Sequence, residues 1–121
     1  MNISEFKLLL AKSEFTPKEI LEILAKDEDY MVRATVAQNL NAPKEILKIL
    51  AKKNEISWVR VCVARNINAS KEILKILAKD KNPNIRIFVA ENLNAPKEIL
   101  KILVKDKRWD IRDIAKDNPN Y

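Results

Sequence analysis

Arginine recurs at one position of this sequence, at intervals of 27, 26 and 26 residues. The four residues are Arg33, Arg60, Arg86 and Arg112. A guanidinium group is a planar fork of N–H donors that matches the two oxygens of a carboxylate or a phosphate. Possible partners lie near them in the sequence: Asp29, Glu55, Asn82, Asp106 and Asp110. We expect a ladder in which each guanidinium binds an acid or a carbonyl of its own or the adjacent unit. The alternative is a row that binds the phosphates or carboxylates of a partner.

Lysine recurs at every fourth residue of three other segments. These stripes are Lys44, Lys48 and Lys52; Lys71, Lys75 and Lys79; and Lys97, Lys101 and Lys105. Side chains four residues apart share one face of a helix, and packed helices lie about 8–10 Å apart, so the stripes predict one basic face. Such a face is either a solvated helix surface or a platform that binds nucleic acid or an acidic protein through charge.

Three large aromatic residues, Tyr30, Trp58 and Trp109, fall in or near the turns that precede the arginines. Other units have small or polar residues at these positions, so the repeat itself does not need an aromatic ring. The rings either fill gaps between helix layers or anchor a partner. The candidate partner-binding residues are therefore Lys48, Lys52, Lys75, Lys79, Lys101, Lys105, Trp58 and Trp109.

Other reactive side chains are scarce. The 121 residues include no histidine, no glycine and a single cysteine, Cys62. Most structural zinc sites, iron–sulfur clusters, Ser-His-Asp triads and Cys-His pairs need histidine or several cysteines, and phosphate-binding loops need glycine. We predict no catalysis, no metal and no cofactor. A base-excision type of enzyme that uses Asp110 or Asp113 with Trp109 is a remote alternative, which rests on an analogy of fold alone.

Charge is uneven along the chain, whose net charge is +6. Residues 1–30 carry four lysines and seven acids, while basic residues outnumber acids in residues 31–121. This asymmetry indicates either an acidic partner or a lysine-rich solvated surface. No apolar run approaches the roughly 20 residues that cross a bilayer, and the N-terminal segment lacks the basic start of a signal peptide. We expect a cytoplasmic protein without a membrane segment, and its oligomeric state is left open.

These residues are carried by a repeated pair of segments. The first segment begins PKEILEILAKD, PKEILKILAKK, SKEILKILAKD and PKEILKILVKD at Pro17, Pro43, Ser70 and Pro96. Its apolar residues, such as Ile46, Leu47, Ile49 and Leu50, would lie on one face of a helix with the lysines opposite. The second segment, VRATVAQN in the first unit, predicts a shorter helix with apolar residues at i, i+3 and i+4.

Each unit has a predicted start and end. Thr16, Pro17 and Glu19 fit a capping box in which Thr16 is the helix cap. The units end at asparagines: Asn39, Asn66, Asn92 and Asn118. Because asparagine tolerates the left-handed backbone conformation better than most residues, we interpret these residues as C-terminal caps or as a hydrogen-bonded ladder between units.

A period of about 26 residues is typical of a solenoid, in which each unit buries its apolar face against its neighbours. We predict an all-α fold, a single α-solenoid domain of about four two-helix repeats. Residues 1–15 would form an N-terminal capping helix, and residues 16–41, 42–68 and 69–94 would form repeats. Residues 95–121 would form the last repeat with a degraded cap, since Asp113 and Lys116 replace apolar residues there.

The string IRIFVAENLNAPKEILKILVKD, residues 85–106, resembles the leucine-rich repeat variant family. Units of that family read roughly VR-x-x-VA-x-N followed by a Pro-Glu-Leu-Leu-x-x-Leu-Ala-x-Asp helix, and HEAT-like repeats are similar. The match spans residues 16–118. It implies a right-handed superhelix of two helix layers, one of them partly 3₁₀. The founding type of that family carries a cysteine-bound iron–sulfur cluster, but this chain lacks the cysteines, so that cofactor is not carried over.

The repeat and the scarcity of reactive side chains together predict a non-catalytic scaffold that binds a protein or peptide partner. Sequence-independent binding of nucleic acid through the lysine-rich face is the alternative.

Overall fold

The computed structural model describes residues 1–121 and contains helices but no strands, so the all-α prediction is confirmed. The longer helices are α1 (Ile3–Lys12), α3 (Tyr30–Gln38), α5 (Ser57–Arg65), α7 (Pro83–Glu91) and α9 (Trp109–Asp117). The shorter helices have seven residues each: α2 (Lys18–Leu24), α4 (Lys44–Leu50), α6 (Lys71–Leu77) and α8 (Lys97–Leu103). None of the nine combines the length and hydropathy that crossing a membrane requires.

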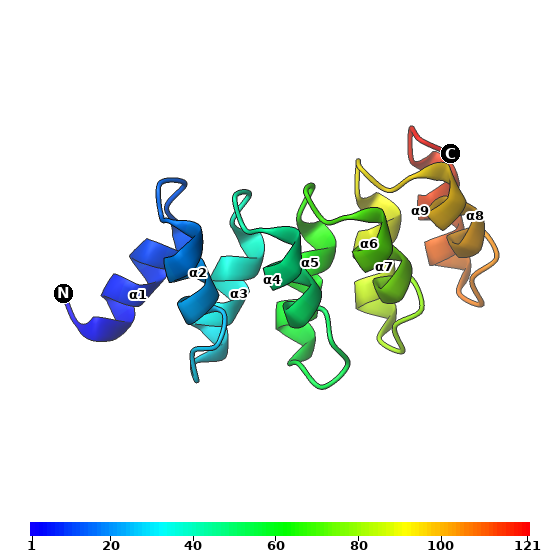
Figure 1. The fold of residues 1–121 in the computed structure, drawn as a ribbon. Coiled ribbons are helices and arrows are strands. Elements are labelled where there is room, and N and C mark those ends of the chain that lie inside the picture. Colours follow the sequence, from blue (N-terminus) through cyan, green and yellow to red (C-terminus); the bar gives the residue numbers. More distant parts are fainter.

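The helices are arranged in two rows (Figure 1). The odd-numbered helices pack on one another in chain order, from α1 to α9, and the even-numbered helices lie in a second row against them. The turns from odd to even helices line the upper edge in the view of Figure 1, and the turns from even to odd helices line the lower edge. Equivalent residues of successive units therefore stand in line along one edge or one face.

The hydrophobic core lies between the two rows. Helix α3 contributes Val32 and Val36, and α4 contributes Ile46, Leu47 and Leu50, all of them buried. The 32 buried apolar residues form one continuous cluster along the molecule. Neighbouring units thus share their interior, and burial of these side chains is the main source of stability.

The relative lengths of the two helices in a unit differ from the prediction. The PKEILKIL segment forms the shorter helix, because Pro43 is extended, with φ −61° and ψ 150°, and only the next residue is helical. At the other end of the equivalent helix α2, the amides of Lys26 and Asp27 donate to carbonyls three residues earlier, which is a tighter turn than an α-helix. The arginine-bearing segment forms the longer helix.

The predicted capping box is also wrong. Pro17 occupies the N-cap position of α2, so Thr16 lies one residue too early, and its hydroxyl donates instead to the Leu10 carbonyl of α1. Ser70 stands at the position of Pro17 in its own unit and does cap its helix, since its hydroxyl accepts a hydrogen bond from the Ile73 amide.

Ile49 does not lie on the buried face of α4, as the sequence pattern suggested, but is 45% exposed. The row of odd helices covers only the middle of the apolar stripe, and Ile49 is at the edge of that stripe. Its equivalents Ile23, Ile76 and Ile102 are exposed for the same reason.

Candidate partner-binding surfaces

The repeated arginines are bound within the molecule. Both guanidinium nitrogens of Arg33 that face Glu55 donate to its carboxylate, at 2.9 Å each. Arg60 binds Asp80 and Arg86 binds Asp106 in the same way, with a shorter N–O distance of 2.8 Å in each pair. In all three pairs, the carboxylate belongs to the turn that precedes the next odd-numbered helix. The guanidinium groups are therefore already occupied.

Backbone carbonyls complete this arginine ladder. The remaining nitrogen of Arg86 donates to the carbonyls of Asp80 and Lys81, and Arg112 donates to the carbonyl of Asp106. The first unit has Lys7 at the arginine position, and Lys7 forms an ion pair of 2.8 Å with Asp27. Arg33, Arg60 and Arg86 thus each tie two neighbouring turns of the lower edge together.

Two acids that lie close to the arginines in the sequence have other partners. Asp29 caps α3, since its carboxylate accepts a hydrogen bond from the Met31 amide. Asp110 is held by the exposed Arg108, with N–O distances of 3.1 and 2.8 Å, and this hydrogen bonding lowers its pKa. Asp113, the other acid of the enzymatic alternative, is exposed on α9.

The ladder changes the acidity of its carboxyl groups. Burial raises the pKa of Asp106, but hydrogen bonds from the Arg86 side chain and the Arg108 amide outweigh burial and hold that pKa below its ordinary value. The pKa of Glu55 is lowered by the same balance, with Arg33 as the donor. These two carboxyl groups therefore stay ionised to a lower pH in the folded protein than they would in water.

The asparagines that end the units form a second ladder at the upper edge. The side-chain amide of Asn66 donates to the carbonyls of Ala37 and Asn39 in the preceding unit, at 2.9 and 3.1 Å. Its oxygen accepts a hydrogen bond of 2.8 Å from the Asn68 amide. The equivalent bonds recur at the other three positions: Asn39, Asn92 and Asn118.

The left-handed conformation proposed for these asparagines is wrong, because no residue of the chain has a positive φ. Asn66, for example, is extended, with φ −72° and ψ 120°. A second asparagine two residues later also reaches the preceding unit, as Asn68 does by donating to the Leu40 carbonyl at 2.6 Å. Sequence reasoning missed this row, although the Asn-x-Asn spacing signalled it: Asn41, Asn68, Asn94 and Asn120.

The six candidate lysines are all exposed. Lys48, Lys75 and Lys101 lie in the middle of the even-numbered helices, beside the exposed isoleucines. Lys52, Lys79 and Lys105 lie just beyond the ends of these helices, on the lower edge. At the beginning of these helices an acid offsets a lysine, since Lys71 pairs with Glu98 of the next unit.

The structure brings the candidate aromatic residues to the same lower edge. Tyr30, Trp58 and Trp109 stand at the first or second residue of their odd-numbered helices, where they are 43, 39 and 69% exposed. Trp109 therefore does not fill a gap between the layers. Additional exposed cations occur in the turns of this edge: Lys53, Lys81, Lys107 and Arg108.

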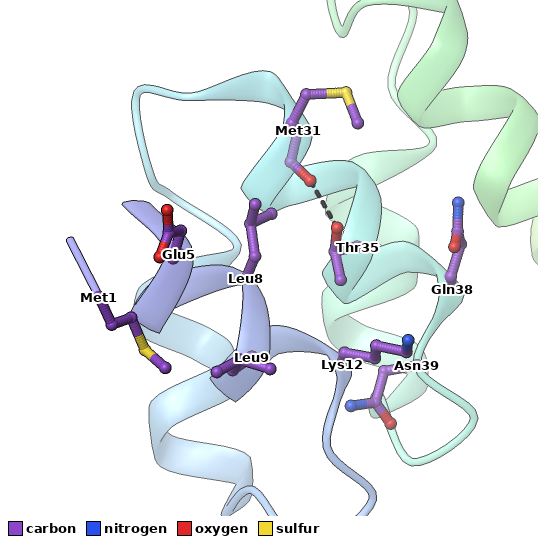
Figure 2. Close-up of a pocket in the computed structure, with 9 residues that line it drawn as sticks. All are labelled: Met1, Glu5, Leu8, Leu9, Lys12, Met31, Thr35, Gln38 and Asn39. Carbon is purple, nitrogen blue, oxygen red and sulfur yellow. Dashed lines mark hydrogen bonds between the residues drawn. The ribbon is translucent and has the colours of Figure 1, made fainter. Parts of the chain in front are cut away.

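A groove lies between α1 and α3, and the sequence analysis did not find it. Figure 2 shows Leu8 of α1 opposite Thr35 of α3, with Met31 at the top of the view and Leu9 at the lower left. Its volume is about 700 Å³. The run of leucines in residues 8–10 was the only signal of it in the sequence.

The lining of the groove combines apolar and polar side chains. Met1 also contributes to the apolar lining, and Glu5, Lys12, Gln38 and Asn39 contribute polar groups. A smaller hollow of about 380 Å³ lies between α3 and α5. It is lined by Gln38, Leu40, Cys62, Arg65, Asn66 and Ile67.

Arg65 and Gln38 are held in place beside this second hollow. The Arg65 guanidinium lies 5.3 Å from the centre of the Phe88 ring, and the Gln38 amide donates to the Cys62 sulfur at 3.1 Å. The hollows between α1 and α3 and between α3 and α5 thus follow one another along the outer face of the odd-numbered row.

Comparisons of the chain with protein-family models, curated proteins and solved structures gave no match.

Proposed function

We propose that this chain is an α-solenoid scaffold that binds a protein or peptide partner and has no catalytic role. In this proposal the units in residues 16–41, 42–68, 69–94 and 95–121 stack as a right-handed superhelix, with residues 1–15 as the first helix of the stack. The protein is cytoplasmic, in keeping with the free thiol of the buried Cys62.

The groove between α1 and α3 carries this proposal. Its lining combines apolar side chains with one acid, one base and the exposed Gln38 amide, which suits an amphipathic peptide better than a uniformly charged ligand. Met31 adds an adaptable side chain of the kind that accommodates varied apolar anchors. Lys12 and Arg65, on successive hollows, favour an acidic side chain in the bound segment.

The partner is therefore an amphipathic peptide segment with an apolar anchor in the groove and an acidic residue beside it. The test begins with selection of binders from a displayed random peptide library and continues with fluorescence anisotropy on the best peptide. Met31→Asp should weaken binding at least about tenfold, because it places a charge in the apolar part of the lining. The substituted residue lies in the first turn of α3, where an acid is favourable to the helix.

Lys75→Glu on the opposite row serves as the matched control and should leave peptide affinity unchanged. Peptides that bind equally well to the Met31→Asp variant, or selection that enriches no apolar anchor, would refute this site.

Sequence-independent binding of nucleic acid is a second candidate, and the lower edge is the observation that favours it. Exposed aromatic rings and unpaired lysines alternate there, and Trp109 is the most exposed ring. Lysines neutralise phosphates, while tryptophan stacks on bases regardless of sequence. Single-stranded nucleic acid offers both groups.

Titration with a fluorescent oligothymidylate at several salt concentrations tests this candidate. Neutralisation of about four phosphates predicts a slope near −3 in a plot of log K against log salt. Trp109→Ala should weaken binding at least about fivefold, whereas Phe15→Ala on the upper edge should not. A slope near zero would remove the candidate.

A further inference from the structure

The hollow between α3 and α5 is followed by a third hollow, between α5 and α7. Its volume is about 140 Å³. It is lined by Arg65, Ile67, Phe88, Glu91, Asn92 and Leu93. Adjacent hollows share residues, since Gln38 lines the first and the second, and Arg65 and Ile67 line the second and the third. The three hollows therefore form one continuous track along the outer face of the odd-numbered row.

An exposed apolar side chain borders the track in three turns of the upper edge. Leu40, Ile67 and Leu93 occupy the same position of successive units and are 55, 45 and 65% exposed. Each stands between two asparagines whose side chains donate to the preceding unit, so the turn is held without it. The equivalent residue of the first unit is the exposed Glu14, so the fold does not require an apolar side chain here. An exposed apolar row of this kind is typical of an interaction surface.

One position on the outer face of the odd-numbered helices changes its charge from unit to unit. All its residues are exposed, and none forms an ion pair within the chain: Lys12, Gln38, Arg65, Glu91 and Asp117. Positions that hold the units together keep one kind of residue, as the arginine and asparagine ladders do, so stacking does not impose this change of charge. A segment that complements the row places an acidic side chain beside Arg65 and none beside Glu91.

Arg65 is prepared for such an acid. Its guanidinium lies over the Phe88 ring, which holds the charge in place and leaves N–H donors available to a carboxylate. The second hollow contains no acid, whereas the third contains Glu91. A carboxylate therefore fits the second hollow, between Arg65 and Gln38.

The spacing of the hollows matches an extended peptide. Packed helices lie about 8–10 Å apart, so successive hollows are separated by about that distance. A polyproline II chain advances about 3.1 Å per residue and returns every third side chain to the same face, which places those side chains about 9 Å apart. Side chains on one face of a β-strand lie about 7 or 13 Å apart and do not match.

The size of the third hollow also favours an extended chain. An α-helix is about 10–12 Å wide, whereas about 140 Å³ corresponds to a cube about 5 Å wide. A volume of about 140 Å³ is also about that of five water molecules, which suits one branched apolar side chain. The track therefore fits a single chain that lowers one side chain into each hollow.

We propose that the peptide partner binds across all three hollows as an extended segment of the polyproline II type. It carries an apolar side chain at every third position and an acidic residue beside Arg65. This inference rests on the proposed function, since it describes how the same partner continues beyond the groove between α1 and α3. It adds the conformation of the segment, the spacing of its anchors and the place of its acid.

Ile67→Asp tests whether the segment reaches beyond the first groove. The probe is the best peptide of the library selection, and fluorescence anisotropy measures its affinity. The variant should weaken binding at least about tenfold, because Ile67 lines both the second and the third hollow. Ile76→Asp is the matched control: Ile76 is also 45% exposed, but it lies on α6 in the even-numbered row, so its variant should bind normally. Both variants should keep the far-ultraviolet circular dichroism spectrum of the wild type.

Alanine substitution along the same peptide tests the conformation. The side chains whose loss weakens binding at least about fivefold should be apolar and three residues apart. A spacing of seven residues, or of three and four in alternation, would show a bound helix. A single anchor would show that the segment stops in the first groove. Each of these results would overturn the proposal.

An exchange of charge tests the role of Arg65. Arg65→Glu is compatible with the fold, because glutamate stands at the equivalent position in Glu91. It should weaken binding at least about tenfold, and replacement of the peptide's acid by lysine should restore the affinity of this variant to within about threefold of the original pair. Lys75→Glu reverses an exposed charge on the other row and should have no effect. Failure of the lysine peptide to rescue Arg65→Glu would refute the contact.

Met31→Asp separates this proposal from the proposed function. Weaker binding in both Met31→Asp and Ile67→Asp supports both. Weaker binding in Met31→Asp alone keeps the peptide site and refutes the extended segment. Unchanged binding in Met31→Asp refutes the site in the first groove, and with it a segment that spans all three hollows.

Discussion

Asn66→Ala should lower the free energy of unfolding by about 3 kcal/mol, since it removes two buried hydrogen bonds and a partly buried one, worth about 1 kcal/mol each. The side chain is 4% exposed, and it joins the ends of two successive units by donating to Ala37 and Asn39. Truncation would leave these carbonyls and the Asn68 amide short of a partner. Urea unfolding followed by circular dichroism at 222 nm measures the loss.

Asn68→Ala is the matched control, because Asn68 is also an amide of the upper edge but is exposed. Its loss should be under about 1 kcal/mol, since water can replace the hydrogen bond to the Leu40 carbonyl. Asn66→Asp should destabilise more than Asn66→Ala, because it turns a carboxylate oxygen toward two carbonyl oxygens. Equal losses in the alanine variants of Asn66 and Asn68 would show that the first ladder does not hold the units together.

Asp106→Ala should destabilise the protein by about 3–5 kcal/mol, which is typical when one partner of a buried ion pair is removed. The side chains of Arg86 and Asp106 are 7 and 8% exposed, and their hydrogen bonds are 2.8 and 3.3 Å long. The variant would leave the guanidinium charge buried with only the carbonyls of Asp80 and Lys81 as acceptors. Denaturant unfolding at neutral pH gives this value.

Two variants separate burial from ion pairing as the cause. The double variant Arg86→Met/Asp106→Leu should lose less stability than Asp106→Ala, because it leaves no unpaired charge. Glu98→Ala removes the exposed partner of Lys71 and should cost under about 1 kcal/mol. An Asp106→Ala loss as small as that of Glu98→Ala would contradict the structural role given to the arginine ladder.

The same pair predicts how stability depends on pH. The pKa of Asp106 is lower in the folded protein than its ordinary value, so its contribution is fully present above that ordinary value, near pH 4. The contribution is lost as the pH falls through the folded-state pKa. Wild-type stability should therefore fall steeply below about pH 4, and Asp106→Ala should flatten the curve. Glu55, which is shifted in the same direction, leaves part of the slope in the variant.

Local patterns account for the parts of the structure that were correctly predicted. Apolar spacing identified all the helices, because burial on one side of a helix imposes a short period on the sequence. Helix lengths and caps were predicted less well. By residue type, Pro43 fits either the N-cap or the first helical position, and Thr16 fits either the N-cap or the residue before it. Only the backbone angles and hydrogen bonds distinguish these positions.

The sequence by itself determined the period, the helical content and the residue types available at each repeated position. The tertiary structure decided which of these residues meet. Arg60 pairs with the carboxylate of Asp80, 20 residues away, and not with the carboxylate of Glu55, which is nearer in sequence. Trp109 joins the lysines of the lower edge, and Met31 and Leu9 line one groove. The reason is physical. Periodicity in a sequence indicates which face of a helix is buried. Contacts between units also depend on how successive helices are offset when they pack, and a short stretch of sequence does not determine that offset.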